Sequence, residues 1–246
     1  MKEILSSFIL TSLAGLSTLI GYFIIFIKGD KNKIIAFALS FASGIMLTIS
    51  IIDLIPSSNS YLKNYHIIFR FLLMIFFFIF GVFISSYISK KVEINNQDSL
   101  KKVGIISMLA IIIHNIPEGI ITFMVSGINF KLGIKLAIAI SLHNIPEGIS
   151  IAIPYFYATK KKLKTFIIVL ISGLSELLGA IICYIFLRNL INDFIIGCIF
   201  SLIAGIMINI SLSELLPESF KYKNTRTSYL GFVIGIIIMI LSHILV

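Results

Sequence analysis

Apolar residues run along the chain in eight long stretches that are separated by short polar segments. Each stretch has about 20 mostly apolar residues, the length that an α-helix needs to cross a bilayer. None shows the short alternating pattern of a barrel strand, and each is too long for one strand. The pattern therefore predicts eight transmembrane helices, at about residues 4–27, 34–55, 67–88, 103–126, 133–157, 165–187, 194–216 and 229–246.

The composition supports a bilayer as the surrounding medium. Of 246 residues, 58% are hydrophobic and 13% are charged, and the mean hydropathy is +1.07. A soluble domain has about half apolar and about a quarter charged residues, so this chain has too little polar surface to coat a globule. These values exclude a nucleic-acid-binding protein, a disordered chain and a secreted disulfide scaffold. The first stretch follows Lys2 and Glu3 without a cleavage site, so we expect a retained span rather than a signal peptide.

Basic residues are distributed unequally between the two sides of the predicted bundle. Fourteen of the Lys and Arg residues fall on one side, in the segments at 28–33, 90–102, 160–164 and 221–226, and six fall on the other side. Because cytoplasmic loops carry the excess of Lys and Arg, this predicts a cell-membrane protein with both termini outside the cytoplasm. The longest of these segments, about 89–102, is predicted to be a flexible connector.

Three pairs of segments resemble each other. HNIPEGI occurs at His114–Ile120 and at His143–Ile149, GLSTLIG at Gly15–Gly21 parallels GLSELLG at Gly173–Gly179, and SGIMLTISIIDLIP at Ser43–Pro56 parallels AGIMINISLSELLP at Ala204–Pro217. The last two pairs have offsets of 158 and 161 residues, so about 1–88 recurs in about 165–246 around a central pair at about 103–157. An odd number of spans between copies makes the repeat inverted, within a single domain of residues 1–246. Convergence of low-complexity apolar sequence is the alternative.

Five acidic residues fall inside the predicted spans: Asp53, Glu118, Glu147, Glu176 and Glu214. An ionised side chain at the centre of a bilayer costs up to about 3 kcal/mol on insertion scales. We find no Lys or Arg in the same span interiors to pair with these acids, so a bound cation or protons must compensate them. Asp53 and Glu214 lie near predicted span ends, where a water-facing role and a role in metal access both remain open.

The two HNIPEGI motifs carry metal-binding side chains at helical spacing. His114 and Glu118 are four residues apart and share one face of a helix, and Asn115 lies on the adjoining stripe. His143, Asn144 and Glu147 repeat this arrangement. Imidazole, carboxylate and amide groups together suit Zn²⁺, Fe²⁺ and similar divalent ions. A single intramembrane His or Asn often only links helices, but two identical clusters favour a shared metal site.

Residues around the motifs add to this prediction. Pro117 and Pro146 each remove a backbone donor and should bend their helices. Gly119 and Gly148 should let the two motif helices approach each other closely. Glu176, whose repeat counterpart is Thr18, should add a third carboxylate from one half of the repeat only.

The doubled HNIPEG motif, SGLSELLGA at Ser172–Ala180, and the GIM and Pro pattern of the second and seventh spans resemble the ZIP family of divalent-metal transporters, most closely its ZupT-type and GufA-type branches. The resemblance implies a bundle of three, two and three helices with a two-metal centre. One metal would be held by His114, Glu118, His143 and Glu147, and the second by Asn115, Asn144, Glu176 and the two bridging motif glutamates. Some relatives have an acidic residue in place of Asn144, and the histidine-rich loop of many eukaryotic members is absent here. The resemblance also implies a homodimer, with metal as the substrate and no cofactor.

We therefore predict a transporter that moves Zn²⁺, with Fe²⁺ or other divalent ions, into the cytoplasm by alternating access. One alternative is a membrane di-metal enzyme. Di-iron centres use Glu-x-x-His spacing, however, whereas here His precedes Glu by four residues, and the HExxH zinc-protease motif is missing. A second alternative is a proton-coupled carrier or channel for another substrate, with the carboxylates as a proton relay.

Overall fold

The computed structural model describes residues 2–95, 99–187 and 192–245, and every regular element in these residues is a helix. Eight helical segments are long and apolar enough to cross a membrane: Ile4–Phe26, Lys31–Tyr61, Ile67–Val92, Ser99–Ile128, Phe130–Thr159, Lys162–Phe186, Asp193–Phe220 and Thr225–Ile244. The prediction of an all-α protein with eight spans is confirmed. Arg188 and residues 96–98 of the predicted connector lie outside the described residues.

Several spans are built from more than one helical segment. In chain order the elements are α1 (Lys2–Leu16), α2 (Thr18–Tyr22), η1 (Phe23–Phe26), α3 (Lys31–Ile49), η2 (Ser50–Leu54), α4 (Ile55–Tyr61), α5 (Ile67–Asn95), α6 (Ser99–Ile128), α7 (Phe130–Thr159), α8 (Lys162–Ile182), η3 (Cys183–Leu187), α9 (Asp193–Ile210), η4 (Ser211–Leu215), α10 (Leu216–Phe220) and α11 (Thr225–Leu245). The element η1 is a 3₁₀ helix, whereas η2, η3 and η4 are π-helical turns.

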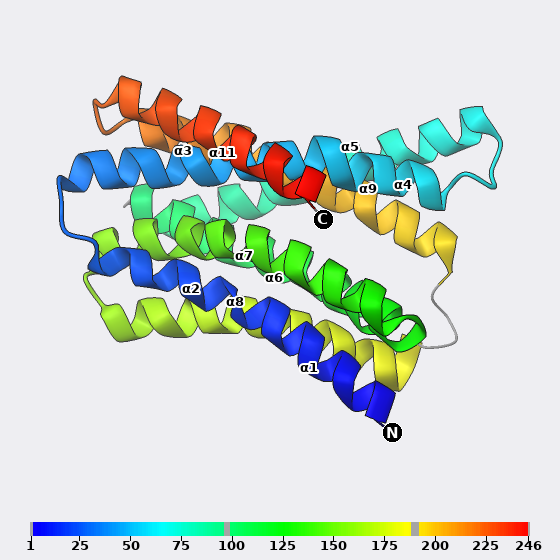
Figure 1. Ribbon diagram of the computed structural model, residues 1–246. Coiled ribbons are helices and arrows are strands. Elements are labelled where there is room, and N and C mark those ends of the chain that lie inside the picture. The colour runs from blue at the N-terminus through cyan, green and yellow to red at the C-terminus, as the bar shows by residue number, and fades with distance from the viewer. Residues whose placement is uncertain (1, 96–98, 188–191, 246) are drawn as a thin grey trace.

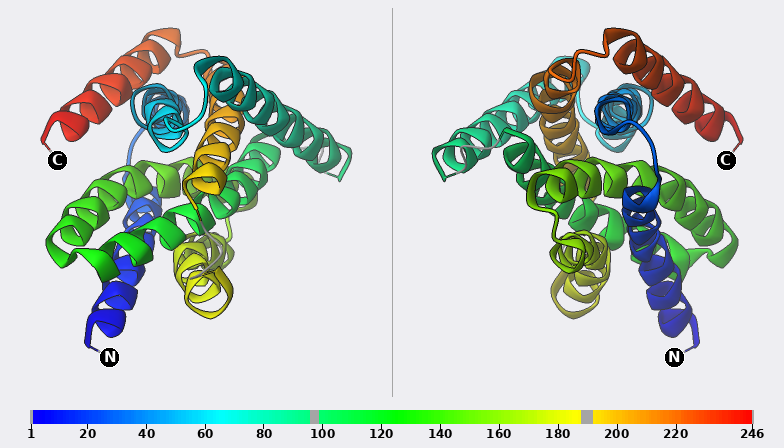
Figure 2. Two further views of the ribbon diagram at one scale, coloured as in Figure 1. Left: turned by 90° about the vertical axis from the view of Figure 1, so that its right-hand side faces the viewer. Right: turned by 90° about the vertical axis from the view of Figure 1, so that its left-hand side faces the viewer.

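The helices form two layers (Figures 1 and 2). One layer contains α1, α2, α6, α7 and α8, and the other contains α3, α4, α5, α9 and α11. In the second layer α3 packs against α11 and α5 packs against α9, and α3 also contacts α7 across the layers. The largest buried apolar cluster lies between the layers and includes Ile45 of α3, Ile106 of α6, Ile153 of α7 and Ile206 of α9. The core therefore holds the two layers together next to the motif helices.

Connections that contain or adjoin most of the lysines lie together at one end of the bundle. These are the segments at 28–30, 160–161 and 221–224, which Figure 1 shows at its left-hand side. We call this the lysine-rich end and refer to the other as the opposite end. The first turn of α6 lies at the lysine-rich end, and the single-residue connection at Asn129 between α6 and α7 lies at the opposite end. Adjacent spans therefore run in alternating directions, as a multi-pass membrane protein requires.

The local geometry of the second and seventh spans repeats with the offset seen in the sequence. The π-helical turn at Ser50–Leu54 recurs at Ser211–Leu215, which is 161 residues later. In both spans the chain returns to an α-helix with a proline in its first two positions. A π turn is rare and leaves a local change in helix register. Two such turns at equivalent positions support the inverted repeat.

Close contacts of glycines follow the same repeat. A Cβ added at Gly148 would collide with the backbone oxygen of Thr18, and one added at Gly119 would collide with the backbone oxygen of Glu176. Gly15 and Gly173 would each collide with the other's backbone oxygen. Thr18 and Glu176, like Gly15 and Gly173, are counterparts at an offset of 158. The first span thus packs against α7 as the sixth span packs against α6.

Three expectations from the sequence are wrong. Gly119 and Gly148 do not bring the motif helices against each other, because they face α8 and α2 respectively. The predicted connector at 89–102 is helical at 89–95 and at 99–102, since α5 and α6 extend into it. Finally, the spans that contain Asp53 and Glu214 do not end near residues 55 and 216 as predicted; they continue to Tyr61 and to Phe220, and both acids lie inside π turns. Pro117 lies inside α6, which runs unbroken from Ser99 to Ile128.

Candidate metal site

The core of the candidate site consists of two histidines and one glutamate from the motif helices. His114 and Glu118 lie on α6, and His143 lies on α7. The Nε2 atom of His114 is 3.0 Å from Glu118 Oε1, and the Nε2 atom of His143 is 3.2 Å from the same oxygen. One potential ligand atom from each residue lies within 4.8 Å of the other two, and all three side chains are buried. This is the spacing at which three groups can bind one ion.

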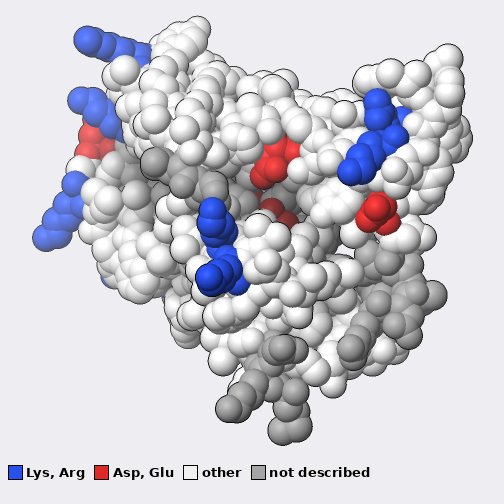
Figure 3. Space-filling view, turned by 45° about the vertical axis from the view of Figure 1, so that its right-hand side comes forward, with Lys and Arg blue, Asp and Glu red and all other residues white. Residues whose placement is uncertain are grey.

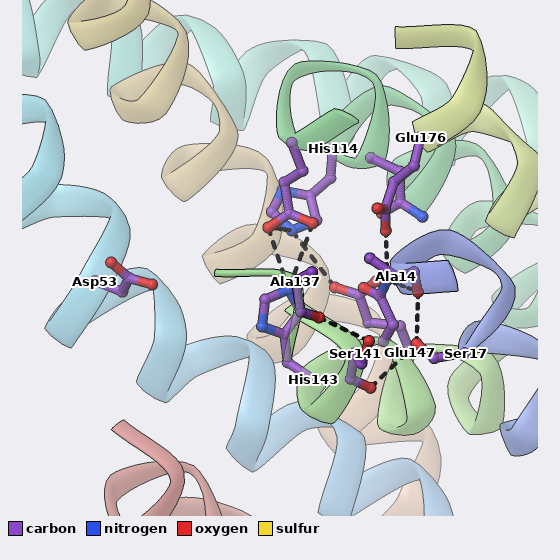
Figure 4. A network of polar contacts seen from close by, with 12 residues as sticks. Ala14, Ser17, Asp53, His114, Ala137, Ser141, His143, Glu147 and Glu176 are labelled. Carbon is purple, nitrogen blue, oxygen red and sulfur yellow. Dashed lines mark hydrogen bonds and ion pairs between the residues drawn. The ribbon is translucent and has the colours of Figure 1, made fainter. Parts of the chain in front are cut away.

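Glu147 completes a set of four potential ligands. It lies on α7, four residues after His143, and its Oε1 is 3.6 Å from His114 Nε2. Its side chain is only 1% exposed. The two motifs therefore supply one imidazole and one carboxylate each to the same buried place, as their helical spacing predicts (Figure 4).

The two motif asparagines are anchored by backbone carbonyls of the neighbouring helices. Asn115 Nδ2 donates to the carbonyl of Ser172 on α8 at 3.1 Å, and Asn144 Nδ2 donates to the carbonyl of Ala14 on α1 at 2.9 Å. Ala14 and Ser172 are repeat counterparts at the offset of 158. Because each amide nitrogen is held this way, each Oδ1 is directed elsewhere.

Glu176 makes the site asymmetric. Its side chain is buried on α8, and its Oε1 accepts a hydrogen bond from Asn144 Nδ2. Figure 4 shows its carboxylate pointing toward the group of residues that contains Glu147. The counterpart of Glu176 in the first span is Thr18, which is also buried and whose Oγ1 has no hydrogen-bond partner in the described residues. Of these two counterpart positions, only the one in the sixth span therefore carries a carboxylate.

Several buried oxygens of these residues accept no hydrogen bond in the described part of the chain. They are Asn115 Oδ1, Asn144 Oδ1, both carboxylate oxygens of Glu147, and Glu176 Oε2. Leaving a buried acceptor unsatisfied costs about 1–3 kcal/mol, and more for a charged group. Every one of these atoms is an acceptor without a hydrogen bond in the described residues, although Glu147 Oε1 lies 3.6 Å from His114 Nε2. A cation is the kind of partner that such a set lacks.

A cavity of about 260 Å³ leads away from the cluster toward the opposite end of the bundle. It is lined by Glu118 and His143 at one side and by Asp53, Ser57 and Tyr61 of the second span at the other. Figure 4 shows Asp53 apart from the His and Glu cluster, and Figure 3 shows acidic side chains within a hollow of this face. Sequence analysis left the role of Asp53 open, and the structure places it on a route between the cluster and the outside of the bundle.

The expectation that no lysine pairs with the intramembrane acids is wrong for Glu214. Lys102 Nζ in the first turn of α6 lies 3.6 Å from Glu214 Oε2. Glu218, just beyond it, is buried and pairs with Lys221 at 2.7 Å and with the Ser99 hydroxyl at 3.1 Å. Hydropathy missed Lys102 as a partner because the predicted fourth span began after it, at residue 103. No Lys or Arg among the described residues forms an ion pair with Glu118, Glu147 or Glu176.

The anchoring carbonyls of Ala14 and Ser172 were missed altogether. A backbone carbonyl carries no residue-type signal, so only the repeat of the flanking GLS sequence marks these positions. The fold and the site together define a multi-pass membrane protein with a buried His and Glu cluster that could hold a divalent metal ion.

Comparison with known proteins identifies the family. Residues 91–243 match the model of the family described as ZIP Zinc transporter. The chain is 37% identical to the "Zinc transporter ZupT" of Clostridium perfringens, over 100% of this chain and 97% of that protein. It is 39% identical to the protein of the same name from Oceanobacillus iheyensis, over 100% and 99% of the two chains, and 38% identical to that from Chlorobaculum parvum, over 99% and 98%.

This chain belongs to the ZIP zinc transporter family. Membership places it among transporters of divalent metal ions and not among enzymes, so the di-metal enzyme alternative has no support. The metal is accordingly a substrate and not a resident cofactor.

Proposed function

We propose that this protein carries Zn²⁺, together with Fe²⁺ and similar divalent ions, across the cell membrane into the cytoplasm. The observation that carries the proposal is the set of buried acceptor oxygens without donors beside two imidazoles. Burying these unsatisfied oxygens costs free energy when no cation is bound, and a bound cation offsets this cost. The names of the relatives, which are zinc transporters, point to the same substrate.

The first metal position is formed by His114, Glu118, His143 and Glu147. The distances between the first three suit a single ion, and Glu147 lies beside His114. Nitrogen and carboxylate ligands in fourfold coordination are the usual environment of Zn²⁺ in proteins. These groups replace the hydration shell of the ion, and no bond is made or broken other than to water and ligand.

The second position is formed by Asn115, Asn144 and Glu176 with the two motif glutamates as bridges. The free Oδ1 atoms of both asparagines and the free Oε2 of Glu176 support it. Because the two asparagine oxygens are neutral ligands and the two glutamates are shared with the first position, Glu176 is the one charged ligand that belongs to this position alone. We expect it to bind more weakly than the first.

Transport proceeds by exposing these positions to one side of the membrane at a time. The cavity lined by Asp53, Glu118 and His143 gives access from the opposite end, which the lysine distribution assigns to the outside. At the lysine-rich end, buried apolar residues of the central cluster separate the ligands from water. Alternating access needs a second conformation that is open to the other side. Because equivalent contacts occur in both halves of an inverted repeat, each half can adopt the conformation of the other, and this gives the second conformation.

Uptake into proteoliposomes tests this assignment. Glu118→Ala and Glu147→Ala should each abolish most zinc uptake while the purified protein remains monodisperse. Ser12→Ala on α1, whose hydroxyl only bonds the Phe8 carbonyl in its own helix, is the control and should transport normally. Variants of Glu118 and Glu147 that fold and transport at the unmodified rate would overturn the site.

The orientation and assembly are part of the same proposal. Both termini should lie outside the cytoplasm, and a cysteine-reactive or protease probe applied to intact cells would locate each terminus. The homodimer implied by family resemblance should appear as a dimer mass in detergent-corrected scattering, and a monomer mass at transport-competent concentrations would remove it from the proposal.

A further inference from the structure

The ion pair between Lys102 and Glu214 joins the two layers at the lysine-rich end. Lys102 belongs to α6 in one layer, and Glu214 belongs to the π turn that follows α9 in the other. The nitrogen and oxygen are 3.6 Å apart, and the side chains are 16% and 12% exposed. A pair this shielded is less screened by salt than a surface pair.

Glu214 and Asp53 are repeat counterparts in different surroundings. Both lie in equivalent π turns, 161 residues apart. Asp53 faces the cavity that reaches Glu118 and His143, and the only side-chain hydrogen bond described for it is from Ser57 at 3.3 Å. Glu214 is paired with Lys102 instead. Asp53 therefore lines the cavity, whereas its repeat counterpart Glu214 is held in an ion pair.

Apolar packing closes the same end behind the ion pair. Val103, Ile106 and Ala110 of α6 are at most 4% exposed, and they belong to one cluster with Met207 and Ile210 of α9. These residues lie between the ion pair and the ligands. An ion that leaves toward the lysine-rich end must pass a point where α6 and α9 have separated.

Lys102 shares α6 with two of the proposed metal ligands, His114 and Glu118. His114 follows Lys102 by twelve residues, which is roughly 18 Å along α6. Since α6 is continuous, a movement that carries His114 and Glu118 also moves Lys102 relative to Glu214. The state of the ion pair is thus mechanically linked to the position of the site.

We propose that Lys102 and Glu214 form a latch that holds the lysine-rich end closed while the metal site is reached from the opposite end. The proposal rests on the proposed function, because a latch of this kind operates only in a protein whose two ends open in turn. Breaking the pair favours the state that is open at the lysine-rich end. Glu214 in this role is a conformational element and not a metal ligand.

Two reporter cysteines measure which end is open. Ser107→Cys places a thiol on α6 between Lys102 and His114, at a buried serine whose hydroxyl makes no hydrogen bond in the described residues. Ser57→Cys places one in the cavity at the opposite end. Both are made in a background in which the two buried cysteines, Cys183 and Cys198, are alanine. The readout is the rate of reaction with a charged methanethiosulfonate reagent.

Lys102→Met and Glu214→Gln should each raise the reaction rate at Ser107→Cys about threefold to tenfold. Each change removes a modest interaction that stabilises one of two conformations, and so it shifts the population toward the other. The same changes should lower the rate at Ser57→Cys. The charge swap, Lys102→Glu with Glu214→Lys, should bring both rates back toward the starting values. Lys164→Met, at an exposed lysine in the first turn of α8 at the same end, is the control and should change neither rate.

Other outcomes overturn the latch. Unchanged rates at both reporters in Lys102→Met mean that the pair does not hold the end closed. A rise at both reporters means local loosening and not a change of access. A swap variant that labels like the single variants means that the effect is not due to the pair. Because labelling needs no zinc flux, a protein that labels as expected yet takes up no zinc would refute the proposed function and leave the latch standing.

Discussion

The contact between Gly119 and the backbone of Glu176 allows a sharp test of how α8 supports the metal site. An alanine Cβ at position 119 would lie 2.6 Å from the carbonyl carbon of Glu176 and 2.8 Å from its Cα. Carbon atoms in ordinary contact are about 3.5–4.0 Å apart, so α6 and α8 must separate by roughly 1 Å. The obstacle is main chain and not a flexible side chain, so no rotamer change relieves it.

This separation should weaken metal binding as well as the fold. Overpacking of this size costs about 1–3 kcal/mol of stability. Metal ligands must be placed within about 0.2 Å, and the shift moves Glu176 and the Asn115 anchor relative to Glu118. We expect the zinc affinity of Gly119→Ala to fall about 10- to 100-fold, the usual effect of disturbing groups that orient metal ligands. Isothermal titration of zinc into purified protein gives the affinity, and a thermal melt gives the stability.

Gly127→Ala provides the matched control on the same helix. A Cβ at position 127 would meet only Ser7 Oγ, at 3.7 Å, which is ordinary contact. This variant should bind zinc like the unmodified protein. Equal zinc affinity in Gly119→Ala and Gly127→Ala would show that the separation of α6 and α8 does not matter to the site, and the reasoning from close packing would fail.

Three further predictions follow from the hydrogen bonds and the ligands. Asn144→Ala should weaken zinc binding more than Asn115→Ala does in the same titration, because Asn144 also donates to Glu176; the reverse order would argue against a second position that depends on Glu176. Ser58→Ala should destabilise the fold by about 1 kcal/mol in a thermal melt with zinc affinity unchanged, since its hydroxyl bonds the Gly197 carbonyl at 2.7 Å, far from the ligands. Zinc affinity should fall as the pH is lowered, because imidazole ligands must lose a proton to bind metal and protons then compete with zinc; an affinity that stays flat from pH 7.5 to 5.5 would argue against histidine ligands.

The spans and the ligand cluster were accessible from the sequence because each depends on a strong local pattern. Apolar runs of bilayer length fix the number of helices, and the four-residue spacing of His114 and Glu118 places them on one face. The predicted first and last residues of the spans were less accurate. The second span continues to Tyr61 through polar residues that hydropathy excludes, because their hydroxyls bond within the bundle, as Ser58 does to Gly197 and Ser201.

What the sequence could not supply is the identity of the packing partners. Gly119 and Gly148 are marked as sites of close approach by their lack of side chains, but nothing local says which helix approaches them. The structure gives α8 and α2, and not the other motif helix. The pairing of Lys102 with Glu214 joins residues 112 positions apart for the same reason. Such contacts are set by the layer arrangement and not by any window of sequence.

The presence of Glu176 opposite Thr18 has a consequence for electroneutrality. The two motif glutamates and Glu176 together can hold three negative charges, an odd number, whereas zinc arrives in steps of two. One zinc ion leaves the ionised trio one charge short of neutral, and two zinc ions overshoot by the same amount. One zinc ion together with one proton on any of the three carboxylates makes the total charge zero. Because of the third acid, the number of protons that the site holds therefore depends on the number of zinc ions bound.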